Sequence, residues 1–198
     1  MNDKRKSRLF DNDKIIALIF MALTVIFIVA SMTNQAFFDW VYDRHHHPWS
    51  WYIRPLFIIP FCFFAYRHSW SGMSITLFCI FTSMFWFSRP EVVPDNVQSF
   101  LAFEKAWLYG DWTYQKILLI LTVPLSFLAL GLAFWKRSLW IGLAVVVLMA
   151  TGKIIWSVQH AGEAGKSILT PAVVGLGICI VLIYYGFKRL ERKRTSEH

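Results

Sequence analysis

Carboxylate and imidazole side chains gather in one polar segment of the chain, residues 33–51, which reads TNQAFFDWVYDRHHHPWSW. If residues 35–46 form a helix, Asp39, Asp43 and His46 follow one another at positions i, i+4 and i+7 and share one helix face. Carboxylates and an imidazole at this spacing can hold a divalent metal ion or relay a proton. The candidate metal ligands are therefore Asp39, Asp43, His46 and His47, with a divalent metal ion as the candidate cofactor.

The same segment also fits an interfacial helix, whose tryptophan and tyrosine residues anchor it among lipid headgroups while its histidines are solvated. Three consecutive histidines cannot all bind one ion from a regular helix, and Pro48 moves His47 away from helical geometry. A short histidine run without a spaced partner motif is a weak indicator of a metal site. The pattern therefore favours the interfacial helix, and the metal site stays as the alternative.

One carboxylate in a second polar segment, residues 88–113, needs a partner. Asp95 is a good N-cap after Pro94, and an apolar stripe runs from there until Gly110 ends the helix. Glu104 falls on that stripe. An acidic side chain among apolar ones must pair with a cation or a polar network, or project into water. The segment predicts a helix that does not cross the membrane and a buried partner or a vestibule for Glu104.

Two basic residues, Arg54 and Lys153, lie about one turn inside apolar runs, at equal depth and on the same side. Each of them alone can snorkel to the headgroups. Together with Glu104 they can instead line an outward-facing pocket for an anionic headgroup or a small carboxylated solute. The candidate ligand-binding residues are Arg54, Lys153, Glu104, His160, Asp43 and Trp107.

The segment around His160, HAGEAGKS, superficially resembles a phosphate-binding loop. His160 stands where that loop requires glycine, and an apolar helix precedes the segment where the loop requires a strand. We therefore expect a flexible turn and no nucleotide site. Despite the net charge of +8, we also expect no nucleic-acid partner, because the basic residues form short clusters beside apolar runs.

Six apolar runs must position these residues, and each is long and apolar enough to be a membrane-spanning candidate. They are residues 15–32, 51–66, 73–87, 117–135, 139–157 and 168–187. With 57% hydrophobic and 16% charged residues, the 198-residue chain fits a helical bundle in lipid better than a soluble domain. We expect an all-α, polytopic bundle of six transmembrane helices in a single domain, residues 1–198, with one or two short interfacial helices on its outer face.

The basic residues predict how this bundle is oriented. If the N-terminus is cytoplasmic, 13 of the 20 lysines and arginines fall in the inner segments, as the positive-inside rule requires. Six spans then return the C-terminus to the cytoplasm, and the first run is a retained signal anchor. Residues 1–14 and 188–198 are cytoplasmic, and residues 33–50 and 88–113 are outer segments. The predicted location is the inner (plasma) membrane of a bacterium, with membrane lipids as partners.

Three classes of function fit these patterns. The first is a binding or transport protein with an outward pocket for a small or lipid-like anionic ligand, and its aromatic walls are Trp51, Trp107, Trp112 and Trp156. The second is a membrane-embedded enzyme that acts on lipid at the outer interface, with either a metal or a general acid/base drawn from Asp39, Asp43, His46, His47, Glu104 and His160. The third is an accessory subunit of a larger membrane complex. The first class is the one we expect.

Overall fold

The computed structural model describes the backbone of residues 2–196 and the side chains of residues 11–192. Six of the basic terminal side chains that support the predicted orientation therefore lie outside the described residues. They are Lys4, Arg5, Lys6, Arg8, Lys193 and Arg194.

The described chain is 87% helical and contains no strand, which confirms the predicted all-α fold class. The helices are α1 (Asn2–Thr33), α2 (Gln35–His45), α3 (Pro48–Leu56), α4 (Ile58–Tyr66), α5 (Trp70–Thr82), α6 (Asp95–Tyr109), α7 (Tyr114–Trp135), α8 (Leu139–Gly165) and α9 (Leu169–Ser196). Two short 3₁₀ helices accompany them, η1 (Ser83–Phe85) and η2 (Lys166–Ile168).

Polar side chains cap several of these helices. The side chain of Asn34 accepts the backbone N–H of Phe37 at the start of α2 (3.0 Å). Such a cap satisfies one of the N–H groups that the first helical turn leaves unpaired. The start of α5 is capped twice, by Ser69 and by Asp13 of α1. Because the Asp13 carboxylate accepts two backbone N–H groups and two hydroxyl groups there, it ties α1 to α5.

The apolar run 51–66 forms two helices instead of one, α3 and α4, which meet at Phe57. Pro60 has no N–H to donate to the carbonyl of Leu56, so the α-helical ladder is interrupted here. The backbone of Phe57 stays in the right-handed helical region, and its N–H bonds to the carbonyl of Arg54, three residues back. The run is therefore two helices that join at Phe57 and not one uninterrupted helix.

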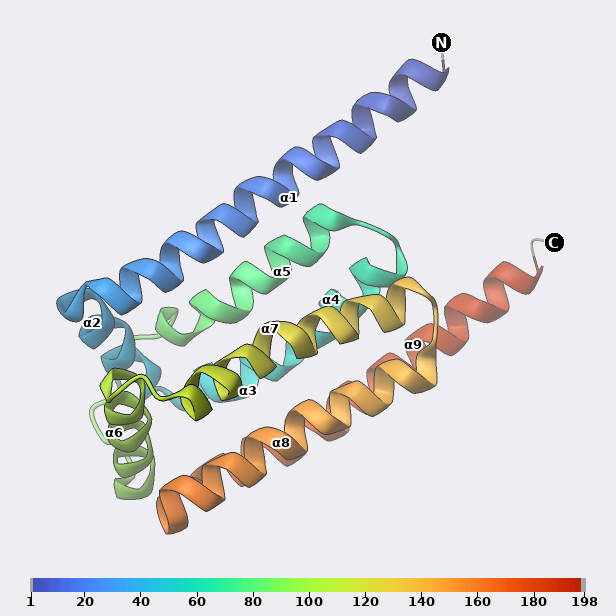
Figure 1. Ribbon diagram of the computed structural model, residues 1–198. Coiled ribbons are helices and arrows are strands. Elements are labelled where there is room, and N and C mark those ends of the chain that lie inside the picture. Colours follow the sequence, from blue (N-terminus) through green and yellow to red (C-terminus); the bar gives the residue numbers. More distant parts are fainter. Residues whose placement is uncertain (1, 197–198) are drawn as a thin grey trace.

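The long helices lie side by side, and the two ends of the chain lie at the same end of the bundle (Figure 1). Helix α1 packs along α5, α4 contacts both α5 and α7, and α8 and α9 form an antiparallel pair. The turn between α8 and α9 begins at Gly162, whose φ of 54° and ψ of −128° favour glycine. This turn, α2 and α6 all lie at the end of the bundle opposite the termini (Figure 1).

Three stretches of helix are long and apolar enough to cross a membrane: Asp11–Thr33, Tyr114–Trp135 and Leu139–Arg192. The last stretch includes the turn at Gly162 and so comprises both α8 and α9. The apolar helix Trp70–Phe85 is shorter. Only 11% of the most apolar part of the first stretch is buried, as expected for a helix that faces lipid. These features are compatible with the predicted membrane protein.

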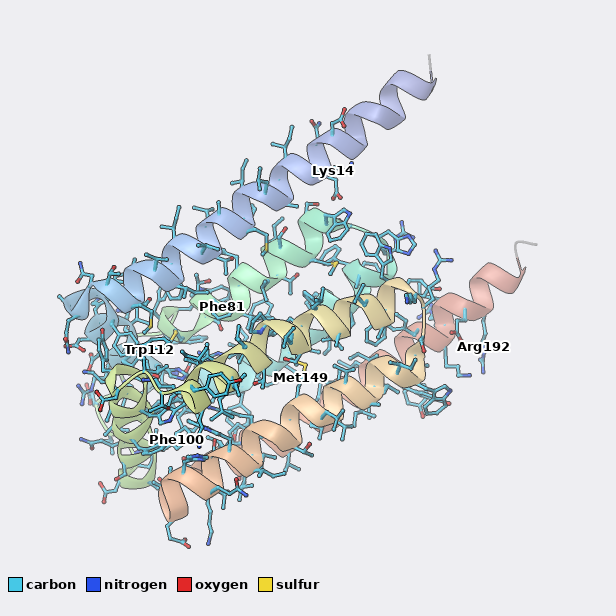
Figure 2. The ribbon with its side chains drawn as sticks, viewed as in Figure 1. Lys14, Phe81, Phe100, Trp112, Met149 and Arg192 are labelled. Atoms are coloured by element: carbon cyan, nitrogen blue, oxygen red, sulfur yellow. The ribbon has the colours of Figure 1, made fainter. Side chains whose placement is uncertain are left out.

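Buried side chains form two separate clusters. The first, here called the bundle core, lies among α4, α7, α8 and α9, and its members include Phe61, Cys62, Leu130, Phe134 and Cys179. The second, here called the end core, joins α2, α6 and η2, and consists of Phe38, Tyr42, Phe100, Leu101 and Ile168. Figure 2 shows Phe100 at the α6 end of the molecule and Arg192 near the opposite end. The end core is therefore the part of the fold that positions the polar residues at this end of the molecule.

Candidate functional site

Helix α6 brings Glu104 to the end core. It lies across the end of the bundle rather than along it (Figure 1), and its residues Phe100 and Leu101 are buried. Glu104 follows Phe100 by four residues and shares its face. The helix ends at Gly110 as predicted, but the predicted N-cap is wrong by one residue: Pro94 occupies that position, and Asp95 is the first helical residue. Its charge still suits the helix start electrostatically.

Glu104 has two partners from other helices. Its Oε1 lies 2.5 Å from the Nζ of Lys153 on α8, and its Oε2 accepts a long hydrogen bond of 3.4 Å from the hydroxyl of Tyr42 on α2. The Glu104 side chain is 16% exposed and that of Lys153 is 48% exposed. The Lys153 ammonium also lies over the rings of Phe100 and Trp156. The carboxylate that needed a partner is thus paired with one of the two cations proposed to share its pocket.

Arg54, the second of these cations, is placed by tight packing of α3 on α9. A Cβ on Gly175 of α9 would lie 2.7 Å from Cγ of Pro55, so the two helices approach closely only because this residue is glycine. The Sγ of Cys179, one turn further along α9, donates to the carbonyl of Pro55 at 3.2 Å. These two contacts hold Pro55, the residue next to Arg54, and so fix the position of the Arg54 backbone from which the side chain extends.

The Arg54 guanidinium has donors without acceptors. Its Nε and Nη2 are buried and have no hydrogen-bond partner, and no carboxylate in the described part of the chain lies within ion-pair distance of it. Its positive charge still acts on Tyr42 and His45. Nε and Nη2 form one edge of the planar guanidinium, which is the edge that binds two oxygens of a carboxylate or phosphate side by side. Buried donors of this kind are normally satisfied.

His45 is a buried neutral imidazole beside this arginine. Its Nδ1 lies 2.9 Å from the hydroxyl of Ser50, and that hydroxyl donates its only proton to backbone carbonyls, that of His47 at 2.7 Å being nearest. His45 must therefore donate from Nδ1. Burial, and then the positive charges of Arg54 and Lys153, lower the pKa of His45 well below its usual value. The ring adds no positive charge to the cluster at neutral pH.

Tyr42 is likewise neutral. Burial, and then the negative charge of Glu104, raise the pKa of Tyr42 well above its usual value, although the charge of Arg54 acts in the opposite direction. The phenol therefore keeps its proton and donates it to Glu104. We call Tyr42, His45, Arg54, Glu104 and Lys153 the end cluster.

The candidate metal ligands are not gathered at one point. Asp39 pairs with Lys105 of α6 at 2.6 Å, and Asp43 pairs with Arg89. The Nδ1 of His46 lies 2.9 Å from the carbonyl of Tyr42 in its own helix. In the described residues no group of three or more histidine, cysteine, aspartate or glutamate side chains could hold a metal ion.

His47, the fourth candidate ligand, caps a helix instead. Its Nδ1 accepts the backbone N–H of Trp49 at 3.2 Å and so closes the first turn of α3. That role matches the non-helical backbone expected of a residue that precedes proline. The segment is thus built from ion pairs and caps, and the shared helix face of the sequence prediction does not become a shared site.

Two other predicted ligand-binding residues lie at the margin of the end cluster, and one lies apart. His160 is exposed and stacks on Trp156, with ring centroids 5.4 Å apart. Trp107 contacts the same indole edge to face, at 5.1 Å. The Lys153 ammonium lies over the Trp156 ring. Trp156 therefore links the rings of His160 and Trp107 to the end cluster. Asp43 belongs to its separate pair with Arg89.

The sequence prediction missed Tyr42, His45 and Ser50. The first two follow Phe38 at i+4 and i+7, which is the same spacing that drew attention to the acidic face of this helix, displaced by one residue. If the i, i+4, i+7 spacing is examined for residues that would be buried as well as for charged residues, it also identifies this second face. Ser50 carries no signal of its own, since its role depends on how the chain folds back at Pro48.

Further donors near the end of α8 also lack acceptors. The indole Nε1 of Trp156 and the hydroxyl of Ser157 are buried without a partner. Ser157 follows Lys153 by four residues and lies on the same helix face. An indole N–H can only donate, as can a guanidinium, so the unmet demand in this region is for acceptor oxygens.

No family model, no curated protein and no solved structure matches this chain. The chemistry of the end cluster follows from its own residues. It combines two cations with one carboxylate, keeps its tyrosine and histidine neutral, and holds an unused donor edge on a buried arginine. Such an arrangement can bind an anion.

Proposed function

We propose that the chain is a six-span protein of a bacterial plasma membrane, with both termini in the cytoplasm and the end core at the outer surface. The spans are α1, the kinked pair α3 and α4, α5 with η1, α7, α8 and α9. Two observations support this topology: the two ends of the chain lie at one end of the bundle (Figure 1), and 13 of the 20 lysines and arginines of the sequence belong to the segments predicted to be cytoplasmic.

We further propose that the end cluster binds an anionic group, a carboxylate or a phosphate, of a small solute or a lipid. The observation that carries this proposal is the edge of Arg54, whose Nε and Nη2 are buried and unpaired. A bound anion supplies the two oxygens that this edge lacks, and the hydrogen bonds are strong because they are charge-assisted. Binding of this kind serves a receptor or the first step of transport.

The remaining classes of function have less support in the described residues. A metal-dependent enzyme needs several ligands around one ion, and the four candidate ligands are engaged elsewhere, two in ion pairs and two with backbone atoms. No single contact favours an accessory subunit.

Binding is tested on the full-length protein in phosphatidylcholine nanodiscs, with dodecanoate and dodecyl phosphate as probes. We expect saturable binding of at least one probe, and loss of this binding in Arg54→Gln. Lys105→Gln is the control, because it removes one positive charge at the same end of the molecule from a lysine that pairs with Asp39 outside the end cluster. Equal binding by wild type and Arg54→Gln, or no saturable binding of either probe, contradicts the proposal.

Topology is tested separately by cysteine labelling of whole cells, in a background without Cys62, Cys79 and Cys179. A membrane-impermeant maleimide should label Glu163→Cys, in the turn between α8 and α9. It should not label Arg67→Cys, between α4 and α5, until the cells are opened. Labelling of both positions from outside would contradict the orientation.

A further inference from the structure

The charges of the end cluster set the charge of its ligand. Arg54 and Lys153 are cations, Glu104 is an anion, and Tyr42 and His45 are neutral because burial opposes their ionisation. Two positive charges and one negative charge leave one positive charge without a counterpart. An unpaired charge in a buried site is costly, so one negative charge balances the site and a second would be in excess.

The shape of the free donor edge restricts the ligand further. Nε and Nη2 of Arg54 present two parallel N–H groups, which match two oxygens that share one charge. A carboxylate and a phosphodiester both have this form. A phosphomonoester carries a charge of about −1.5 to −2 at neutral pH, which exceeds the one positive charge that the cluster leaves unbalanced.

The position of the site favours one of the two remaining ligand groups, the carboxylate and the phosphodiester, over the other. Exposed tryptophans surround this end of the molecule: Trp40, Trp49, Trp86 and Trp112. Figure 2 shows Trp112 beside α6, at the same end as Phe100 of the end core. Tryptophans gather at the depth of the lipid headgroups, where the phosphates of the membrane lipids lie. At this depth, the abundant anion with two oxygens that share one negative charge is the lipid phosphodiester.

Lys153 provides an entrance. Its side chain is 48% exposed while that of its partner Glu104 is 16% exposed, so the lysine lies at the solvent side of the pair. A long and partly exposed lysine can move aside with little loss of packing. The buried arginine can then meet an anion that arrives from the interface.

We propose that the end cluster binds the phosphodiester of an anionic glycerophospholipid, with its two non-bridging oxygens on Nε and Nη2 of Arg54. This inference rests on the proposed function and names its ligand class. A zwitterionic lipid carries the same phosphodiester but adds a cation, which Arg54 and Lys153 repel.

The test is native mass spectrometry of the full-length protein, with phosphatidylglycerol, phosphatidic acid, phosphatidylcholine and dodecanoate as separate probes. We expect one phosphatidylglycerol per chain and weaker binding of the other three. Arg54→Lys keeps the charge but loses the two-pronged edge, and should weaken phosphatidylglycerol binding roughly tenfold or more. Lys105→Gln should bind as wild type does.

The outcomes separate this inference from the proposed function. Tighter binding of phosphatidic acid, or tighter binding of dodecanoate that depends on Arg54, would overturn the phosphodiester and leave an anion site in place. No binding of any probe that depends on Arg54 would overturn both. The wild type alone gives a second measurement: phosphatidylglycerol should raise its unfolding temperature more than the same concentration of phosphatidic acid or dodecanoate does.

Discussion

Replacing Glu104 by glutamine tests the charge balance of the end cluster most directly. The substitution keeps the size and hydrogen-bonding shape of the side chain and removes its negative charge. Lys153 can then turn to solvent, because its side chain is already 48% exposed. Arg54 cannot, because its unpaired nitrogens are buried. The buried arginine therefore bears most of the cost.

The exposure of the two cations determines how much stability the loss of the Glu104 charge costs. Removing one partner of a buried ion pair costs about 3 to 5 kcal/mol, and an exposed pair is worth about 0 to 1 kcal/mol. Glu104 lies between these limits, since Lys153, its ion-pair partner, is partly exposed, whereas Arg54, whose charge it stabilises without an ion-pair contact, is buried. We expect Glu104→Gln to lower the free energy of unfolding by about 2 to 3 kcal/mol. Lys153→Gln leaves Glu104 near Arg54 and should cost about 1 kcal/mol.

The assay is thermal unfolding of the purified protein in detergent, followed by circular dichroism. For a chain of this length, 1 kcal/mol shifts the midpoint by about 2 to 4 °C, so Glu104→Gln should lose about 4 to 12 °C and Lys153→Gln about 2 to 4 °C. The control is Glu163→Gln on α8, which breaks the exposed pair with Lys166 of η2 and should change the midpoint by about 2 °C at most. A loss in Lys153→Gln that equals or exceeds the loss in Glu104→Gln would refute the reasoning, because Arg54 would then not depend on Glu104.

Three further predictions follow from other contacts. Asp13→Asn weakens the cap that joins α1 to α5 and should lower stability by about 1 to 2 kcal/mol in the same assay; an unchanged midpoint would show that the cap is dispensable. His45 has a folded pKa well below its unfolded value, so the unfolded state binds the extra proton and stability falls as the pH drops below about 6.5. The midpoint of the wild type should therefore fall more between pH 7 and pH 5 than that of His45→Gln, and parallel profiles would contradict a buried neutral ring. Gly175→Ala places a Cβ against Pro55 and should cost about 1 to 3 kcal/mol and weaken anion binding, whereas Gly177→Ala, with open space around it, should do neither; equal behaviour of the two would show that α3 is not held by this contact.

The sequence predicts some features of this site and not others, for physical reasons. Helix α6 and the need of Glu104 for a partner follow from local spacing, because a carboxylate on an apolar stripe is visible in a short window. Local spacing does not predict that Lys153, and not Arg54, is the ion-pair partner of Glu104. Both cations have the same depth in their helices, and the lateral arrangement of α3 and α8 depends on packing between distant segments.

The acidic face of α2 shows a second limit of prediction from sequence. Asp39, Asp43 and His46 share a face on the sequence, and helical geometry predicts no more than that. In the structure the neighbouring face, with Phe38 and Tyr42, is the buried one, so each acidic residue pairs with a cation beside it. Which of two adjacent faces is buried depends on α6, which lies more than fifty residues further along the chain.

The contacts of Pro55 couple the end cluster to the bundle core in evolution. Pro55 packs against Gly175, and its carbonyl accepts a hydrogen bond from Cys179, which is itself a member of the bundle core. A substitution that changes the volume at Cys179 therefore shifts α3 and, with it, the backbone of Arg54. Selection on the position of Arg54 thus also restricts which residues descendants of this chain can carry on this face of α9.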